Sequence, residues 1–341
     1  MNIYSIIKWY HRIKGPRLKL LGILGLHVLR KRYLYIVLDP SLACNLKCRL
    51  CYFSNPDSSK ELKGNFSDAD IAAISDASFH RGLKLQMGCG AEPTTYKGLA
   101  KLVKIGKEKK IPNVSITING SLLTRKRVEQ LVTSGLDELI LSTHGLSQRV
   151  YEEMMRNADF EHFKQLIEHL SEIKNEHPAF KVRINYTMCA DNIDDLKLLP
   201  TIFYKLKPDV IQLRPVQDIG SIAYSNYSVG VIADKYEECI IPVVQFCSAH
   251  KITCIYPQKE NLAWIEQEND KQQHLNSAVD MLPYFHLSPH KTWKEEFNPY
   301  EETFEQYAKR THRIKNILRM LFCMKSSNQE GITKSLNYDI R

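Results

Sequence analysis

Residues 34–53 read LYIVLDPSLACNLKCRLCYF, a short β-type run that leads directly into three cysteines. The apolar and β-branched residues at its start predict a buried strand. Six further β-type runs follow, and they alternate with segments of helical period. About six βα units at this spacing predict a parallel sheet with right-handed crossovers, either open or curled into a barrel. The active site of such a sheet lies at the carboxyl ends of its strands.

The expected elements follow one another along residues 33–258. The expected strands are Leu34–Leu38, Lys84–Met87, Val114–Ile118, Glu138–Thr143, Val182–Met188, Val210–Leu213 and Ile252–Ile255. The expected helices are Asp68–His80, Tyr96–Lys109, Arg125–Thr133, Phe160–Glu176, Ile193–Lys207 and Ala233–His250. Ser67 with Asp70 predicts a capping box on the first helix. Gly135 marks the end of the third helix, and Asn192 is the expected N-cap of the fifth.

The charge of the chain is unevenly distributed. Of the total of +9 over 341 residues, residues 1–32 carry +8 and residues 306–341 carry +6, which leaves −5 on residues 33–305. This mildly acidic body disfavours a general nucleic-acid-binding protein. With 43% apolar and 25% charged residues the chain has the composition of an ordinary globular protein. Its longest apolar run, Leu18–Leu29, is interrupted by polar residues and glycines and is too short to span a bilayer.

The cysteines carry the strongest chemical signal. An odd count of nine in a long chain without a cleavable leader argues against a secreted disulfide framework. Cys44, Cys48 and Cys51 form a C-x3-C-x2-C pattern, and a loop of this length can fold around one corner of an iron–sulfur cube. Structural zinc is the competing interpretation, but it requires a fourth ligand that no nearby motif supplies. Three packed structural cysteines are the remaining alternative.

Four further motifs follow later strands in a fixed order. They are Gly88-Cys-Gly-Ala-Glu-Pro93, the Asn119-Gly120 turn, Ser142 with Arg156, and Asn192. Together with the cysteines, these motifs resemble the radical S-adenosylmethionine (SAM) superfamily over residues 34–216. Ala91 stands where the second glycine of the superfamily's Gly-Gly-Glu-Pro motif is found.

The resemblance implies a partial (β/α)6 TIM-like barrel with parallel strands, followed by a mainly helical or irregular C-terminal extension. It implies a [4Fe–4S] cluster on Cys44, Cys48 and Cys51, with one iron open to SAM. The implied SAM contacts are Gly90, Ala91, Glu92, Pro93, Asn119, Ser142, Arg156 and Asn192. In the superfamily the reduced cluster cleaves SAM to a 5′-deoxyadenosyl radical, which abstracts hydrogen from the substrate.

The sequence leaves the substrate unidentified, and a small molecule, a lipid-linked molecule or a peptide are all open. No residue is assigned a catalytic role. A one-electron donor such as flavodoxin or ferredoxin is the expected protein partner, and no nucleic acid is expected. The alternative function is a non-enzymatic, metal-containing protein that binds a membrane or a partner.

The chain is expected to divide into a basic amphipathic segment (1–32), the core barrel (33–258) and an extension with a basic helix (259–341). Both basic segments mix apolar and cationic residues. They either lie in an anionic membrane interface or dock on the barrel with their charges outward. The expected location is the cytoplasm, with peripheral contact at the inner face of the membrane left open.

Several other residues have weaker signals. Cys89 is expected to be a small buried residue, and the C-terminal histidines His274, His286, His290 and His312 are expected on the surface. Cys239 and Cys247 are eight residues apart on one expected helix, a rise of about 12 Å that is too long for one cluster. A single cluster is therefore expected. Tyr284, Phe285 and Trp293 form either a lid over the barrel mouth or a cover on its outer face.

Overall fold

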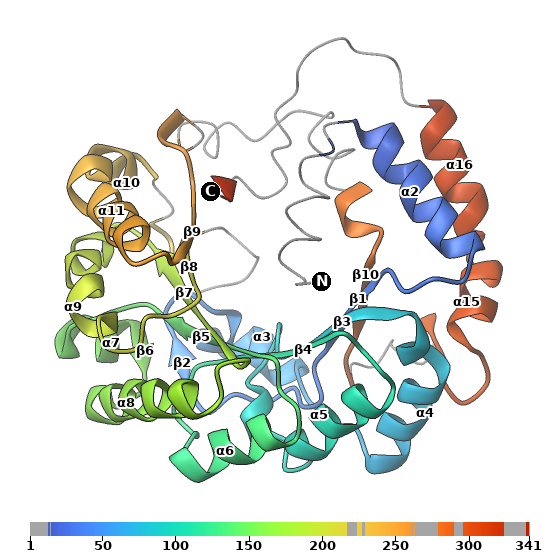
Figure 1. Cartoon of the computed structure of the whole chain (residues 1–341), viewed down its shortest axis with the longest axis horizontal. Helices are drawn as coiled ribbons and strands as arrows, with labels where there is room; N and C mark the ends of the chain where they lie inside the picture. The colour runs from blue at the N-terminus through green and yellow to red at the C-terminus, as the bar shows by residue number, and fades with distance from the viewer. Residues whose placement is uncertain are drawn as a thin grey trace.

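The computed structural model describes residue 13 and residues 15–216, 224–226, 229–260, 262, 279–289, 296–323 and 339–340. One sheet runs through it in the strand order β10-β1-β3-β4-β5-β7-β8-β9-β11 (Figure 1). Its strands are β1 (Leu34–Leu38), β3 (Gly82–Met87), β4 (Asn113–Ile118), β5 (Glu138–Thr143), β7 (Lys181–Met188), β8 (Val210–Pro215), β9 (Thr253–Tyr256), β10 (Tyr284–Leu287) and β11 (Asp339–Ile340). Neighbouring strands from β10 to β9 are parallel, and β11 is antiparallel to β9. The predicted partial barrel of parallel strands is confirmed.

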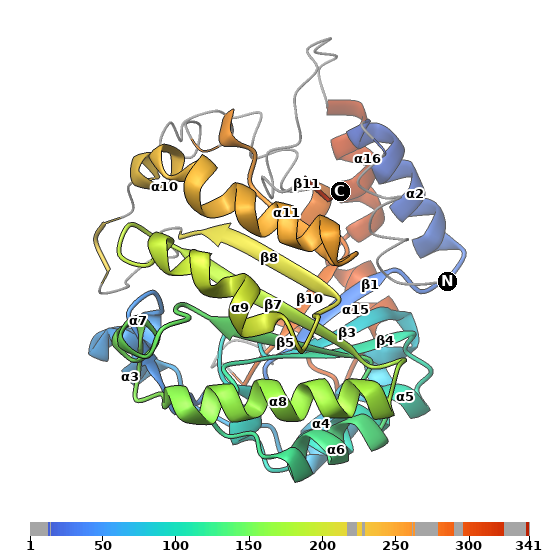
Figure 2. The same cartoon turned by 60° about the vertical axis from the view of Figure 1, so that its left-hand side comes forward.

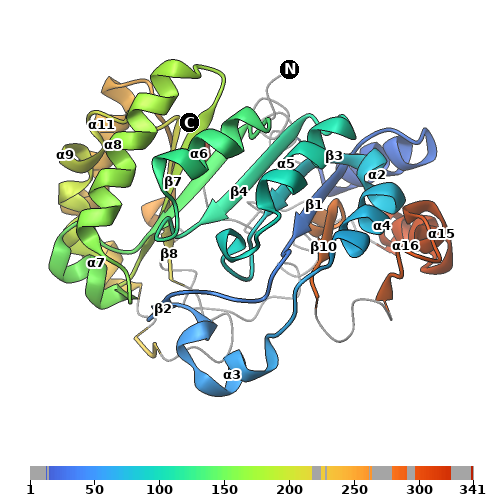
Figure 3. The same ribbon diagram turned by 90° about the horizontal axis from the view of Figure 1, so that it is seen from below.

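Helices cover the outer face of the curled sheet, as Figures 1 and 3 show. The α-helices within the barrel region are α3 (Pro56–Glu61), α4 (Asp68–Ser78), α5 (Leu99–Glu108), α6 (Arg125–Thr133), α7 (Gln148–Met154), α8 (Phe160–Glu176), α9 (Leu199–Phe203), α10 (Gly230–Asp234) and α11 (Ile241–Ala249). Short 3-10 turns are η1 (Tyr52–Ser54), η2 (Phe79–Arg81), η3 (Pro93–Thr95) and η4 (Ile193–Leu198). A separate two-stranded sheet pairs β2 (Lys47–Cys48) with β6 (Met155–Arg156).

The local helix signals are largely confirmed. Ser67 and Asp70 form the expected capping box, and Gly135 adopts a φ of 99° directly after α6. Two expected helices are interrupted. Residues 193–207 form η4 and α9, and residues 233–250 include a π-helical turn, η5 (Tyr236–Ile240), before α11. Pro200 and Pro242 lie in the first turn of α9 and α11, and a proline nitrogen cannot donate the bond that would continue a preceding helix.

The C-terminal extension contributes a strand to the sheet, which the sequence did not predict. Tyr284 and Phe285 begin β10, which pairs with β1 in the register Tyr35↔Tyr284. Both residues thus belong to the sheet itself, and Trp293 lies outside the described residues. The run is only four residues long, which is too short for its periodicity to be distinguished. The ring of Phe285 packs against Phe297 and Phe304 on the outer side, with centroids 5.1 and 5.3 Å apart.

The two faces of the sheet differ in chemistry. Residues such as Leu85, Ile116, Leu139, Ile184 and Leu213 are fully buried and pack beneath the helices. The alternate positions on the inner face are polar. They include Lys84, Gln86, Ser115, Thr117, Glu138, Ser142, Arg183, Asn185 and Gln212. Since closed barrels of this kind are filled with branched apolar side chains, the polar inner face marks this sheet as a binding surface.

The described parts of the two basic ends are helical. They are α2 (Pro16–Val28), α15 (Phe304–Arg310) and α16 (Arg313–Cys323), and α2 packs beside α16 (Figure 2). Residues 1–12, with Trp9 and Tyr10, lie outside the described residues. None of the described helices has the length and apolar character needed to cross a bilayer. The domain boundaries at residues 32 and 258 remain predictions.

Candidate active site

The three clustered cysteines lie in the loop that leaves the carboxyl end of β1. Cys48 belongs to β2, whose pairing with β6 places Lys47 opposite Arg156 and Cys48 opposite Met155. A turn in which the Cys51 nitrogen donates to the Cys48 carbonyl at 3.1 Å closes the loop. Pairing with β6 therefore fixes the backbone of the cysteine loop and brings the predicted SAM contact Arg156 next to it, with an exposed side chain.

The thiols of this loop are largely withdrawn from solvent. Burial raises the pKa of Cys44 to about 11 and also raises the pKa of Cys48 and Cys51. The Leu46 nitrogen and the Asn119 Nδ2 donate to the Cys44 sulfur at 3.4 and 3.8 Å. Buried thiolates need a compensating cation, and N–H donors to sulfur are typical of iron–sulfur sites. The surroundings of the thiols thus suit metal ligands better than free thiols.

The arrangement of the three thiols differs from that of ligands gathered on one zinc ion. Thiolates on a single tetrahedral zinc lie about 3.8 Å apart, because each Zn–S bond is about 2.3 Å long. Within the described residues, the group of Cys, His, Asp and Glu ligand atoms that lie within 4.8 Å of one another is Asp194, Glu238 and Cys239, and the cysteine loop forms no such group. This arrangement fits a multi-iron cluster.

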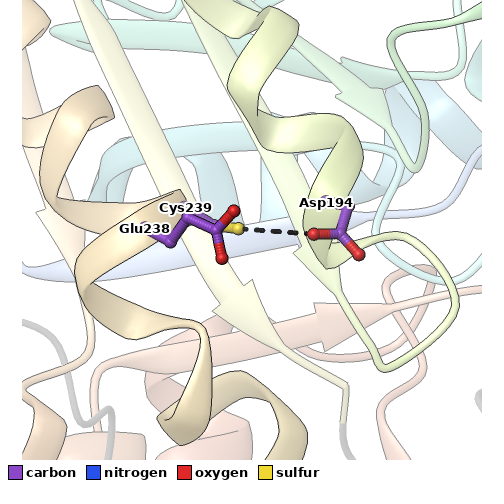
Figure 4. A group of neighbouring side chains, drawn as sticks. All are labelled: Asp194, Glu238 and Cys239. Atoms are coloured by element: carbon purple, nitrogen blue, oxygen red, sulfur yellow. Dashed lines mark hydrogen bonds between the residues drawn. The ribbon is translucent and has the colours of Figure 1, made fainter.

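The Asp194, Glu238 and Cys239 group does not have the character of a metal centre (Figure 4). Lys197 lies 3.3 Å from Asp194 and also pairs with Glu238, while Lys235 forms a second ion pair with Asp194. Lys235, hydrogen-bonded to Asp194, lowers the pKa of that carboxyl. Two ammonium groups therefore already neutralise the carboxylates that a cation would need.

The glycine loop after β3 is fastened to the cysteine loop by Glu92. This carboxylate is 3% exposed and accepts from the backbone nitrogens of Asn119 at 2.7 Å and Thr94 at 3.1 Å, and also from the Thr94 hydroxyl. The Glu92 nitrogen donates to the Ala43 carbonyl at 3.0 Å, directly before Cys44. Glu92 thus joins three of the predicted motif segments, and Asn119 completes the link by donating to Asn45 at 3.0 Å.

Asp39 is a buried residue of this site that the sequence did not reveal. Its carboxylate accepts from the backbone nitrogens of Cys89 at 2.8 Å and Gly90 at 3.1 Å, and His286 of β10 donates to it at 2.8 Å. The Tyr52 hydroxyl donates to the Gly90 carbonyl on the same loop. The C-terminal extension therefore takes part in holding the glycine loop. Cys89 itself is exposed, so the prediction of a buried residue there is wrong.

The remaining predicted SAM contacts differ in whether their polar atoms already have partners within the protein. Ser142 lies half-buried on the inner face, in register with Asn185. Asn192 is 1% exposed, and its amide is used within the protein. It accepts from the Cys189 nitrogen at 2.7 Å and donates to the carbonyls of His144 at 2.9 Å and Thr187 at 2.8 Å. Asn192 thus does not cap the following turn, because its side chain fastens the loop after β5.

Comparison with known families decides what this arrangement is. Residues 38–197 match the family model described as the radical SAM superfamily. This region of the chain belongs to the radical SAM superfamily. Radical SAM proteins bind a [4Fe–4S] cluster and SAM. The match covers the cysteine loop, the glycine loop, Asn119, Ser142, Arg156 and Asn192.

Curated relatives match this chain over only part of their own length. The probable GTP 3′,8-cyclase of Methanocaldococcus jannaschii is 25% identical over 179 residues, which cover 52% of this chain and 53% of the relative. The corresponding protein of Methanococcus vannielii is 33% identical over 126 residues, or 37% and 41% of the two chains. The chain spans about half the length, or less, of these curated relatives.

Solved structures agree on the radical SAM fold. Streptococcus suis SuiB bound to its precursor peptide SuiA has a TM-score of 0.56 at 19% identity, covering 80% of this chain and 63% of SuiB. SuiB bound to S-adenosylmethionine has a TM-score of 0.53 at 18% identity, covering 74% and 57%. At this level of identity the likeness concerns the fold.

The radical SAM cofactors fit the residues present. Three half-buried thiols on one loop suit three ligands of a cubane cluster. Two buried polar atoms beside the motif loops, Ser121 Oγ and His144 Nδ1, have no hydrogen-bond partner among the described residues. Burial lowers the pKa of His144 to about 4, so its ring is neutral near pH 7. These two atoms leave polar groups at the motif loops that a bound ligand could use.

Gly88 is the position in the glycine loop where a side chain is least tolerable. Its φ is +78°, and a Cβ there would lie 2.4 Å from the Thr117 carbonyl oxygen and 2.6 Å from Pro93. We expect Gly88→Ala to lower the free energy of unfolding by about 2–4 kcal/mol, measured by urea denaturation. Gly22→Ala is the control, because no atom lies within 4 Å of its Cβ and alanine favours the helix. Equal stability of both variants would contradict this view of the loop.

Proposed function

We propose that this chain is an enzyme in which Cys44, Cys48 and Cys51 hold a [4Fe–4S] cluster that cleaves S-adenosylmethionine reductively. The observation that supports it most directly is the link from the cysteine loop through Glu92 and Asn119 to the glycine loop. When bound, the cluster supplies one electron to the SAM sulfonium, which yields methionine and a 5′-deoxyadenosyl radical that removes hydrogen from the substrate.

Within this proposal the predicted SAM contacts take two kinds of role. Ala91, the Ser142 hydroxyl and the exposed Arg156 are proposed to contact the ligand directly, whereas the Gly90 backbone is already engaged by Asp39 and Tyr52. Glu92 and Asn192 have their polar atoms engaged inside the protein, and we assign them to positioning the loops that surround SAM. Pro93 begins the turn η3 that follows Glu92 and fixes its direction.

The substrate is proposed to be polar. On the inner face, Lys84 lies 3.2 Å from Glu138, and Arg183 donates to Asn185 at 2.9 Å and also to Gln212. Burial lowers the pKa of Lys84 to about 7 and raises the pKa of Glu138 to about 7. One oxygen of Glu138 has no partner among the described residues. Such a surface is unsuited to a hydrocarbon and suits a small polar molecule or a polar segment of a peptide.

The names of the relatives leave both of these substrate classes open, since one group is named for GTP and SuiB was solved with a peptide. A flavodoxin or ferredoxin remains the proposed electron donor. The comparisons give no support to the non-enzymatic alternative.

The test is anaerobic reconstitution with iron and sulfide, followed by reduction and addition of SAM. We expect 5′-deoxyadenosine and methionine in equal amounts by liquid chromatography, and faster release when a true substrate is present. A fully reconstituted, reduced protein that forms no 5′-deoxyadenosine would reject the enzymatic proposal.

A further inference from the structure

We propose that helices α2 and α16 form a docking surface for an anionic phospholipid membrane. We define the apolar surface as Leu18, Leu21, Leu26, Val28 and Leu29 at α2, with Ile314, Leu318 and Phe322 of α16. These are eight of the fourteen large hydrophobic side chains that are exposed among the described residues. Their concentration on two neighbouring helices is unlike the scattered exposure of ordinary surfaces.

Helix α2 has apolar side chains on both of its faces: Leu20 and Ile23 are buried against the protein, and a second set is exposed. Leu18, Leu21 and Val28 lie on one face of the helix, together with Gly22 and Gly25. The three apolar side chains are between 53% and 60% exposed. The buried face contains Lys19, whose ammonium group is 2.8 Å from Asp280. A helix that only packs on a barrel turns its charges outward and its leucines inward. Lys19 departs from the expectation of charges outward, whereas Arg17 and Arg30 follow it, and packing on the barrel does not explain the leucines on the outer face of α2.

Helix α16 has a matching apolar stripe. Ile314, Leu318 and Phe322 recur every four residues, with 42%, 37% and 84% of their surface exposed, while Ile317 beside the stripe is fully buried. The exposed cations Lys315 and Arg319 flank this stripe. Figures 1 and 2 both show α2 and α16 side by side at the edge of the molecule, where the two helices contact each other.

The charge around the apolar surface selects an anionic partner. Arg17, Arg30 and Lys31 are exposed at the two ends of α2, and residues 15–33 contain no acidic side chain. Exposed leucines surrounded by arginine and lysine suit the interface of an anionic bilayer, where the cations are attracted to the lipid head groups. A helix of 13 residues is about 20 Å long, so α2 would lie in the interface rather than cross the membrane.

The apolar surface on α2 and α16 lies away from the cysteine loop of the candidate active site. Helix α2 leads into the amino end of β1, whereas the cysteine loop leaves the carboxyl end of the same strand. Figure 3 shows α2 and α16 at one edge of the molecule and α3, which follows the cysteine loop, at another. Docking through α2 and α16 would therefore leave the cysteine loop uncovered.

Flotation of the full chain with vesicles tests the proposal. We expect the protein to float with vesicles of equal parts phosphatidylcholine and phosphatidylglycerol. With vesicles of phosphatidylcholine alone, we expect it to remain in the bottom fraction of the gradient. The Leu18→Glu/Leu29→Glu variant is expected to lose at least about tenfold in partitioning, and Arg30→Glu/Lys31→Glu a similar amount. Leu198→Glu, an exposed leucine on η4, is the matched control and is expected to float like the parent chain.

All of the altered residues are exposed, so the variants are expected to fold and to retain SAM cleavage. Equal partitioning of the parent chain and the Leu18→Glu/Leu29→Glu variant would overturn the proposal. It would also be overturned if the parent chain failed to float with anionic vesicles but formed a dimer, by sedimentation equilibrium, that the same variant abolished. That result would make a second copy of the chain the occupant of the surface.

Discussion

A Cys48→Ala variant, reconstituted anaerobically, is expected to bind less than about one iron per chain and to form no detectable 5′-deoxyadenosine. Cys48 has the most strongly desolvated thiol of the three, and its backbone is fixed by the pairing of β2 with β6. A neighbouring ligand therefore cannot move into its place without breaking that pairing. Iron analysis and the visible absorbance of the cluster provide the measurement.

Cys89→Ala is the matched control for this change. Cys89 lies on the glycine loop, but its side chain is exposed and makes no described contact with the other three thiols. We expect this variant to bind about four irons, like the parent chain. A normal iron content in Cys48→Ala, or the loss of iron in Cys89→Ala, would show that the cluster ligands have been misassigned.

Glu92→Ala is expected to produce the second large effect, a loss of about 3 kcal/mol in the free energy of unfolding. The substitution leaves the buried nitrogens of Asn119 and Thr94 without their acceptor. We also expect the affinity for SAM to fall at least about tenfold, because the glycine loop and the Asn119 turn are no longer joined. Urea denaturation and isothermal titration with SAM provide the two measurements.

The control for this prediction is Glu129→Ala. Glu129 pairs with Arg125 at 2.8 Å on the surface of α6, and such exposed pairs contribute less than about 1 kcal/mol. Glu92→Gln keeps one acceptor oxygen and is expected to lie between the parent chain and Glu92→Ala. If Glu92→Ala were as stable as Glu129→Ala, Glu92 would not be the link between the loops.

Much of the fold follows from local sequence. The strands β1 and β5 and the helices α6 and α8 have the predicted bounds, because their apolar spacing and terminal residues agree. Strand β10 was missed because Tyr284–Leu287 is short and pairs with a strand about 250 residues earlier. The sequence also could not show that Lys19 faces inward and Leu21 outward, since α2 has apolar residues on every side.

The sequence predicted which loops form the candidate site better than it predicted the contacts of their side chains. The motifs correctly indicated which loops meet at the carboxyl ends of the strands. They did not show that Glu92 and Asn192 would have their polar atoms engaged by the protein itself. Asp39 was missed because its partners, Gly90 and His286, come from the next loop and from the C-terminal extension. Contacts of this kind depend on tertiary structure, which spacing along the chain does not encode.

Three cysteines that hold a four-iron cluster leave one iron open to SAM, and this open iron has a spectroscopic signature. Electron paramagnetic resonance of the reduced, reconstituted chain tests it most directly. We expect the signal of a reduced [4Fe–4S] cluster whose g-values shift when SAM is added, because the amino and carboxylate groups of SAM would bind the open iron. A spectrum that SAM leaves unchanged, or a protein that binds a single zinc ion in place of iron, would contradict it.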